Sequence, residues 1–536
     1  MAQDMVREEH RRSLGTAALH GLGFLILTAL LTVLIVVQQR AAGAYTAEFS
    51  ATGPEEAGHV VTGLMVADYL AAGLPAPVAF IGDYGLHFPR VVLGLFPPLF
   101  YLLEGLWLTL LEPSTPAVLL LPAALAALLV ASAGWAAARR LGPLPGVAVG
   151  AVLMALPPLR EATLVVGLDL PLALLTLWAG LAYAGFLHRP DRGRALLFGV
   201  LAAAAILTKL TGVALLLLPP LAVLLTRRFA LLRRGAFWLP LLPIVVLAGP
   251  WTIGTLPMVQ AAARGASAVP AFGAQARLVA EGLGAVLAVL AAAGVVLVTR
   301  GAWRGRAGDL LPAVLAALVL AFVAALLILA RGFGLPPSGA ASWLPLYAPL
   351  VMLAAAGGLR LVGLATSGWH TLAGLLVALV MLLAAMPGLM SAIAKPALGL
   401  DAVAQTFLAD TSRPPALLVV AGAEGEGALV AAVAQRDRAL KSFVVPARTA
   451  FTVRGPGPAA GAPLYETPEE LMIGLDRLGV GYVAVAEGGD AWLRERLEAA
   501  IAAHPERFRS LGSFPRPGGA EEARLFALLP APAPAP

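Results

Sequence analysis

Two adjacent carboxylates and a histidine follow the first long apolar run of the chain, in the segment TGPEEAGH (52–59). A carboxylate held at a membrane surface is a candidate general base for an acceptor hydroxyl, so Glu55 and Glu56 are candidate catalytic residues. The alternative is structural, because acids in the first turn of a helix complement its dipole. His59, one helical turn after Glu55, is either a substrate-binding helper or an exposed polar residue.

Two further ionisable residues interrupt apolar segments. Asp169, in GLDLPLALLTL, is expected at the outer mouth of a membrane span, where it is either a third catalytic candidate or an N-terminal cap. Lys209, in ILTKLTGV, must lie at a turn between two short spans or face a polar cavity. Both can hold at once, because the predicted turn places its amine on the external side, where Lys209 is a candidate substrate-binding residue.

Three external cations are also expected near the membrane surface: His87, Arg90 and Arg331. Each alone is typical of a lipid-headgroup contact, but together they suit a phosphate group whose leaving oxygen gains charge. The chain lacks a GxGxxG motif, a P-loop, an HExxH motif and a serine nucleophile elbow. No organic cofactor is therefore expected, and a divalent metal is left open.

The elements that must position these residues are membrane spans. Of 536 residues, 59% are hydrophobic and 13% are charged, which excludes an ordinary soluble protein. The basic net charge comes largely from arginines in short loops, so nucleic acid is not an expected partner. The apolar runs predict eleven spans, at about 17–37, 116–138, 143–159, 168–187, 195–208, 211–226, 235–253, 278–299, 309–330, 342–360 and 369–390.

One further apolar run, residues 93–111, could either span the membrane or lie along its surface. If it spanned, most loop arginines would face outward, against the positive-inside rule. We therefore place the run on the outer surface, with the N-terminus in the cytoplasm. The first external loop, residues 38–115, is then long and contains two surface helices, one starting at GPEE and one over Phe96–Leu111.

Composition changes after Pro396, where polar residues alternate with short apolar segments. We expect a transmembrane domain over 1–396, an extracytoplasmic α/β domain over 397–530 and a Pro/Ala tail over 531–536. The expected strands are 416–422, 441–447, 481–488 and 522–530, and the expected helices are 427–437, 467–479 and 490–503. Thr467 and Glu470 form a predicted capping box.

The order of these features resembles the GT-C glycosyltransferases, and in particular the bacterial relatives of the protein O-mannosyltransferases and the lipid A aminoarabinose transferase. The matching segments, spread over residues 17–390, are GPEEAGHVVTGLMVADYL, FPPLFYLLEGLW, AARRLGPLPG, GLDLPLALLTL, LTKLTGVALLLLPPLAVLL and SWLPLYAPLVMLAAAGG. The resemblance implies a polytopic α-helical membrane fold.

The resemblance also implies transfer of a sugar from a polyprenyl-phosphate carrier to an acceptor hydroxyl of a protein, glycan or lipid at the outer face of a bacterial cytoplasmic membrane. In that family an Asp-Glu pair in the external loop supplies the base, and Glu55 stands at the position of the Asp. Asp169 matches the second acidic position. The family's lysine before the Pro-Pro pair is absent here, so Arg90 is a hypothetical replacement as a phosphate contact.

Two other functions compete with this reading. A transporter or flippase would show half-chain repeats and charges near the bilayer midplane, and the sequence shows neither. A catalytically inert scaffold that presents the C-terminal domain to a partner is the second alternative. It is kept open because Glu55 replaces the family's aspartate.

Overall fold

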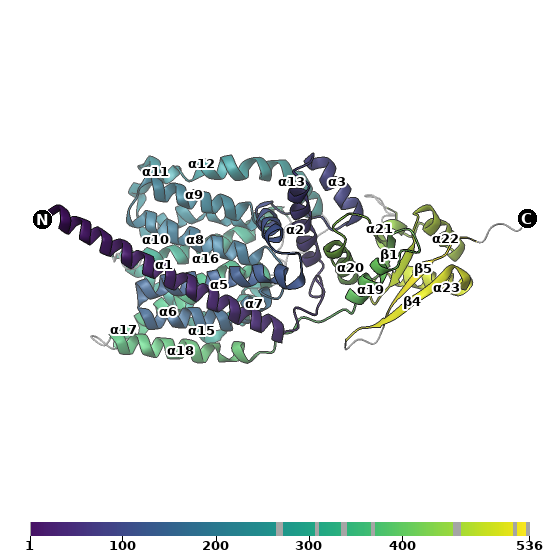
Figure 1. Ribbon diagram of the computed structural model, residues 1–536. Coiled ribbons are helices and arrows are strands. Elements are labelled where there is room, and N and C mark those ends of the chain that lie inside the picture. The colour runs from purple at the N-terminus through teal and green to yellow at the C-terminus, as the bar shows by residue number, and fades with distance from the viewer. Residues whose placement is uncertain are drawn as a thin grey trace, which may run out of the picture.

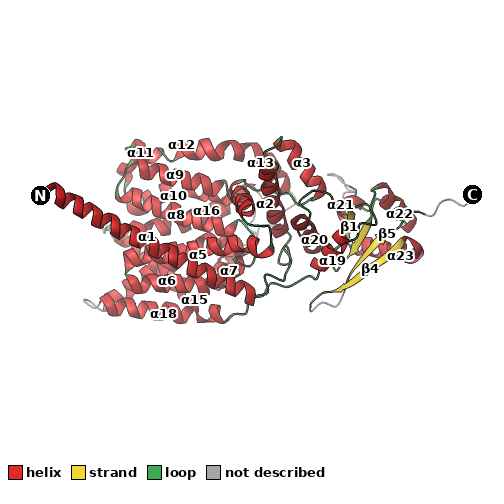
Figure 2. Cartoon of the chain, in the orientation of Figure 1, coloured by secondary structure: helices red, strands yellow, loops and turns green. Residues whose placement is uncertain are grey.

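The structure is a computed structural model that describes residues 2–263, 272–305, 310–333, 340–365, 370–453, 462–517 and 522–531. A helical bundle forms one part of the elongated molecule, and an α/β region forms the other (Figure 1). The helices of the first external loop lie between them. Among the described residues, strands occur in the C-terminal part alone, as the colouring of Figure 2 shows.

Eight helical segments in the described residues are long and apolar enough to cross a membrane, which makes the chain a multi-pass membrane protein. They are Leu19–Ala41 within α1 (Ala2–Ala41), α5 (Thr115–Leu141), α8 (Asp169–His188), Gly235–Ala261, α15 (Ala285–Trp303), Leu310–Arg331 within α16 (Leu310–Phe333), Ala341–Gly363 with α17 (Leu344–Ala365), and α18 (His370–Met390). The segment Gly235–Ala261 combines α11 (Gly235–Trp238), α12 (Leu241–Pro243), the π-helical turn η3 (Ile244–Ala248) and most of α13 (Gly249–Ala263).

The other three predicted spans are helical but are not among these eight long segments. They correspond to α6 (Pro143–Ala155), which is followed by α7 (Pro157–Ala162), to α9 (Arg192–Ile206), and to η1 (Leu210–Leu216) with α10 (Leu218–Thr226). Pro157 ends the first, because a residue before proline avoids the helical region. Lys209 separates the other two in an extended conformation, at the predicted turn. η2 (Phe229–Arg233) and α14 (Phe272–Leu283) complete the bundle.

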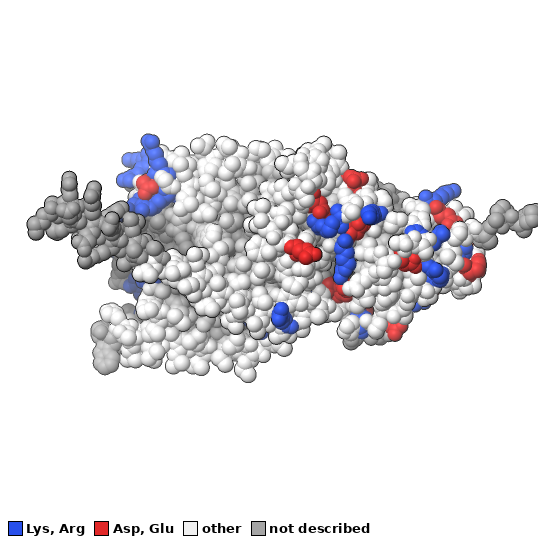
Figure 3. All heavy atoms as spheres, in the orientation of Figure 1, with Lys and Arg blue, Asp and Glu red and all other residues white. Residues whose placement is uncertain are grey.

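Charge is distributed as a membrane protein requires. On the face drawn in Figure 3, basic residues gather at the end of the bundle near the N-terminus, and both signs of charge cover the opposite part of the molecule. A wide band between them carries almost no charge. Such a band suits the hydrocarbon core of a bilayer, where exposed charges are costly.

The first external loop contains three helices, one more than predicted: α2 (Glu55–Ala71), α3 (Pro77–His87) and α4 (Leu99–Leu110). The predicted surface helices correspond to α2 and α4. With twelve residues, α4 is about 18 Å long, too short to cross a bilayer. The sequence analysis missed α3, which begins with Pro77 at its first position and so fits the rule for helix starts.

The C-terminal region is a five-stranded sheet in the order β2-β1-β3-β5-β4. The strands are β1 (Ala416–Val420), β2 (Phe443–Pro446), β3 (Tyr482–Val485), β4 (Phe508–Pro515) and β5 (Glu522–Leu528). The first three are parallel, and β5 joins β3 and β4 in antiparallel pairs. The helices are α19 (Asp401–Ala409), α20 (Ala423–Arg436), α21 (Ala447–Phe451), α22 (Pro468–Arg477) and α23 (Ala491–Ala503), followed by the turn η6 (Pro505–Arg507).

The predicted strands and helices of this region are confirmed, as is the capping box of Thr467 and Glu470. Three elements were missed: α19, α21 and β4. β4 was not predicted because its residues alternate irregularly between buried and exposed, with a register shift between Ser510 and Gly512. Period-two alternation is the signal that predicts a strand, and an irregularity of this kind interrupts it.

The hydrophobic core outside the bundle is shared between distant parts of the chain. Val60 and Leu64 of α2 belong to the same buried cluster as Val430 of α20 and Leu417 of β1. The spans have a separate core of their own. The first external loop therefore packs with residues beyond Pro396 as one unit, although the sequence analysis assigned the loop to the transmembrane domain.

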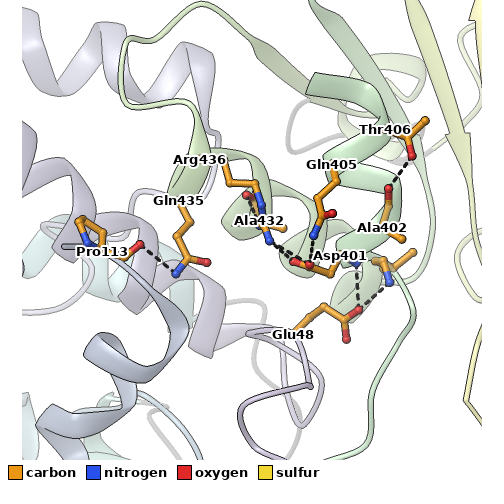
Figure 4. A network of polar contacts seen from close by, with 10 residues as sticks. Glu48, Pro113, Asp401, Ala402, Gln405, Thr406, Ala432, Gln435 and Arg436 are labelled. Carbon is orange, nitrogen blue, oxygen red and sulfur yellow. Dashed lines mark hydrogen bonds and ion pairs between the residues drawn. The ribbon is translucent and has the colours of Figure 1, made fainter. Parts of the chain in front are cut away.

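Polar contacts reinforce this junction (Figure 4). Glu48, in the loop after α1, accepts hydrogen bonds from the backbone N–H groups of Leu398, Leu400 and Asp401 and so caps the start of α19. The Asp401 carboxylate in turn binds the guanidinium of Arg436 at 2.7 Å. The start of the external loop is thereby fixed to the linker that follows the last span.

Candidate active site

The two glutamates that begin α2 face different environments. Successive residues of a helix point about 100° apart, so one of two neighbours can face solvent while the other faces the core. Glu55 is exposed, whereas the side chain of Glu56 is 4% exposed. Both oxygens of Glu56 are occupied: Oε2 accepts from Ser50 N at 2.8 Å, and Oε1 accepts from Val166 N at 3.2 Å and from Lys395 Nζ at 2.6 Å.

Lys395, which the sequence analysis did not select, completes this buried cluster. Its side chain is 0% exposed, and its ammonium also donates to the carbonyl of Leu164 at 3.1 Å. Its backbone N–H donates to Ala42 O at 2.8 Å. The cluster thus joins the loop before α2, the loop before α8 and the linker after α18. A lysine just beyond the last span was the signal available in the sequence.

Asp169 and Lys209 form an ion pair at the N-terminal end of α8. Lys209 Nζ lies 2.7 Å from Asp169 Oδ1, and the two side chains are 17% and 18% exposed. Asp169 begins α8, while Lys209 occupies the extended turn between α9 and η1. The prediction that Lys209 lies at a turn is confirmed. The pair remains open to solvent on one side, unlike the pair of Glu56 and Lys395.

His59 lies inside the first external loop and is not an exposed polar residue, which was one of its two expected roles. It is buried against α4, where its Nδ1 makes a 2.8 Å hydrogen bond with the hydroxyl of Tyr101. Burial, together with the nearby charge of Lys209, lowers the pKa of His59 to about 3. Burial also raises the pKa of Tyr101 well above its ordinary value, with the charges of Glu104 and Glu55 contributing. Both side chains are therefore neutral at neutral pH.

A cavity of about 450 Å³ lies beside Asp169. Its lining includes Thr52 of the loop before α2, Gly167 and Asp169 at the start of α8, and Ile393 of the linker after α18. Glu161 of α7 also lines it, and partial burial raises the pKa of that carboxyl while Arg160 opposes the rise. A volume of this size is within the range of small-molecule sites. Sequence analysis did not select Glu161.

The remaining predicted cations are not brought together. Arg90 donates to Glu426 Oε2 at 3.3 Å and to Ala423 O at 3.2 Å, at the start of α20. His87 is buried, bonds the carbonyl of Ser442 at 2.8 Å and stacks on Phe443. Both residues thus join the external loop to the C-terminal region. Arg331 is exposed in the last turn of α16.

No metal ligand set emerges from the part of the chain that the structure describes. In that part, no group of three or more His, Asp or Glu side chains is placed to hold a metal ion. Asp169 and Glu161 both line the cavity, but Asp169 already pairs with Lys209.

Comparison with known proteins gives similarity in structure alone. No protein-family model matches the chain, and no curated protein matches it. ArnT from Cupriavidus metallidurans bound to undecaprenyl phosphate superposes with a TM-score of 0.56 at 15% identity, over 94% of this chain and 98% of that chain. Its apo state gives 0.53 at 16% identity, over 95% and 98%.

An oligosaccharyltransferase from Archaeoglobus fulgidus in the apo form is also similar. Its TM-score is 0.53 at 11% identity, and the superposition covers 93% of this chain and 74% of that chain. Both proteins belong to the GT-C superfamily of membrane proteins. The superpositions run over nearly the whole chain, spans and C-terminal region together. They show that the chain has the GT-C fold predicted from its sequence.

Proposed function

We propose that this chain, which has the GT-C fold, is a glycosyltransferase that moves a sugar from a polyprenyl-phosphate carrier to an acceptor hydroxyl. Two findings support a lipid-phosphate donor. One solved structure with the same fold holds undecaprenyl phosphate. In this chain, a partly exposed Lys209 side chain stands at the proposed outer end of the bundle, where a lipid phosphate would meet the protein.

The observation that carries the proposal is the contrast between Glu55 and Glu56. Because Glu56 spends both oxygens on internal hydrogen bonds, Glu55 is the carboxylate of the pair that can accept a proton from an incoming hydroxyl. Glu56 fixes Glu55 relative to Asp169, since it bonds the backbone of Val166, three residues before Asp169. In this proposal Glu55 is the base and Glu56 is a positioning residue.

The leaving group then needs a cation more than an acid. A lipid phosphate departs as a stabilised anion, and charge developing on its oxygen is offset by a nearby ammonium. Lys209 supplies that ammonium, and Asp169 orients it by accepting its hydrogen bond at 2.7 Å. The cavity of about 450 Å³ beside Asp169 has room for the sugar. A base on one side and a cation on the other favour direct, inverting displacement.

Location at the outer face of a bacterial cytoplasmic membrane is part of the same proposal. Arginines dominate the charged end of the bundle near the N-terminus, which the positive-inside rule assigns to the cytoplasm. The α/β region after Pro396 and the first external loop then lie outside together. The acceptor would be a protein, glycan or lipid of the cell envelope.

The test uses the full-length protein in nanodiscs with polyprenyl-phosphate donors that carry a radiolabelled hexose, pentose or aminopentose. A membrane and cell-wall extract supplies the acceptors. We expect release of polyprenyl phosphate together with transfer of label to one acceptor class, and inversion at the anomeric carbon by NMR. A flippase would move a labelled lipid across the bilayer without cleaving it, and an inert scaffold would do neither. Either result would remove the proposed activity.

A further inference from the structure

A second cavity, of about 380 Å³, lies at the junction between the first external loop and the C-terminal sheet. Its floor is formed by Gly422 after β1 and by Ala486–Gly488 after β3, and Ala51 and Thr52 close it from the side of α2. Glu424, Glu487 and Arg516 contribute the charged side chains of the lining. None of these residues takes part in the donor site described above, apart from Thr52, which lines both cavities.

The position of this cavity in the sheet has a topological cause. β1 and β3 are parallel neighbours, and the connection from β1 leads outward to β2 on one side while β3 lies on the other. The loops after β1 and β3 therefore diverge at their carboxyl ends. In open α/β sheets this switch point is where ligands bind. Ala51 and Thr52, which precede α2, also line the cavity at this point.

Glycines keep the cavity floor free of side chains. Gly488 and Gly489 have φ angles of 85° and 83°, which side chains disfavour. A Cβ atom on Gly489 would also lie 2.6 Å from the carbonyl oxygen of Ala421. The floor is thus backbone, held by the hydrogen bond from Gly422 N to Glu487 O at 3.2 Å. Gly422 is the N-cap of α20 and provides no side chain to cap the N–H groups of its first turn.

The lining carries charges of both signs. The carboxylates of Glu424 and Glu487 repel an anion, while the guanidinium of Arg516 is ion-paired with Glu487 and, with the positive end of α20, offsets most of the negative charge. Acceptors and donors of hydrogen bonds stand side by side over small apolar residues such as Ala51 and Ala523. A neutral ligand with many hydroxyl groups satisfies both kinds of partner.

We infer that this second cavity binds a neutral saccharide portion of the acceptor. The inference rests on the proposed function, because it makes the cavity part of the path to Glu55. Thr52 separates the two cavities and precedes Glu55 by three residues. An acceptor seated in the second cavity extends past Thr52 and brings its hydroxyl to the start of α2.

The test measures binding without catalysis, with the full-length protein in detergent on an array of neutral, uronic-acid-bearing and amine-bearing oligosaccharides. Neutral oligosaccharides should be retained. Glu424→Trp, which fills the cavity, should weaken their apparent affinity at least tenfold, and Arg516→Ala should weaken it severalfold. The matched control is Glu498→Trp, an exposed glutamate on α23 that does not line the cavity, and it should bind as wild type does.

Thermal unfolding of each variant separates lost binding from misfolding. If Glu424→Trp does not fold, the affinity of Arg516→Ala still tests whether the cavity binds the saccharide. Retention of charged oligosaccharides alone, no retention by the wild type, or equal binding by wild type and both cavity variants would overturn the inference. Glu55→Gln should bind normally. If binding behaves as expected but no sugar is transferred in the donor assay, the proposed function fails while the saccharide site stands.

Discussion

The proposed catalytic groups and the buried ion-pair cluster around Glu56 differ in exposure and in hydrogen bonding, although each includes one of two neighbouring glutamates. The first set consists of exposed Glu55 and the partly exposed pair of Asp169 and Lys209, of which Asp169 lines a cavity. The second has its carboxylate and ammonium almost wholly removed from water and saturated with hydrogen bonds. Groups of the first kind can exchange partners with a substrate, and groups of the second kind can hold a framework.

Mutations in the two sets of residues should therefore affect different properties, activity in the first and stability in the second. Removing a group that acts on substrate should lower activity and leave the fold intact. Removing one half of a buried pair should lower stability first, because the other half is left as an uncompensated charge. Measuring activity and unfolding on the same variants therefore tests whether the proposed catalytic residues and the buried Glu56 cluster have separate roles.

The largest expected effect on activity comes from Glu55→Gln. The amide cannot take a proton from the acceptor hydroxyl, so transfer should fall by about 10²–10⁴-fold, the usual contribution of a general base. Since Glu55 is exposed, the thermal unfolding temperature should stay unchanged. The measurement is the initial rate of polyprenyl-phosphate release. Full activity in this variant would contradict the assignment of Glu55 as the base. An equal loss of activity in Glu56→Gln without loss of stability would contradict the separate roles given to Glu55 and Glu56.

The largest expected effect on stability comes from Lys395→Met. The carboxylate of Glu56 would keep its two backbone donors but lose its counter-charge in a buried site, at a cost of about 3–5 kcal/mol. Thermal unfolding in detergent measures the loss. The double variant Lys395→Met/Glu56→Gln should recover most of it, because no buried charge remains. The control is Lys441→Met, an exposed lysine in the loop before β2. No recovery in the double variant would refute the ion-pair explanation.

A smaller effect is expected from Lys209→Gln. A hydrogen bond to a charged group contributes about 1.5–3 kcal/mol, so kcat/KM for the lipid-phosphate donor should fall by about 10–100-fold when the ammonium that offsets charge on the leaving oxygen is lost. Stability should change by less than about 1 kcal/mol, because the pair with Asp169 is partly exposed and screened by solvent. Initial rates over a range of donor concentrations measure kcat/KM, with Arg40→Gln as the control. An unchanged kcat/KM would place Lys209 away from the donor phosphate.

Periodicity and composition predicted the helices of the membrane spans, the two longer surface helices and most of the C-terminal strands, because those elements follow local apolar patterns. They also placed Lys209 at its turn. They did not separate Glu55 from Glu56. That distinction depends on Lys395, which lies more than three hundred residues away in the chain, and on backbone donors at Ser50 and Val166.

The sites at Arg90 and His87 illustrate the same limit. Their position near the membrane surface suggested a phosphate contact, but the structure pairs them with α20 and β2. No local pattern reveals that the first external loop packs against the C-terminal sheet. The shared core and the second cavity both arise from this long-range contact.

A pH-dependent effect is expected from Glu104, a fully buried carboxyl of α4 that packs against Gly63 of α2, with neither oxygen hydrogen-bonded within the described residues. Burial raises its pKa well above the ordinary value of about 4.5, so the folded protein keeps its proton where the unfolded chain has lost it. Stability from this group is fully present below about pH 4.5, and it falls as pH rises toward the folded pKa, by at most about 1.4 kcal/mol per pH unit.

Glu104→Gln removes that titration while keeping the size of the side chain. Its unfolding temperature should match the wild type near pH 4.5 and exceed it increasingly as pH rises, whereas exposed Glu112→Gln should shift nothing. Unfolding curves from pH 4.5 to 8.5 measure the gap. A constant gap would mean that Glu104 is ionised in the folded protein. The interface of α2 and α4 would then contain a charge, and the contrast with the saturated cluster at Glu56 would no longer hold.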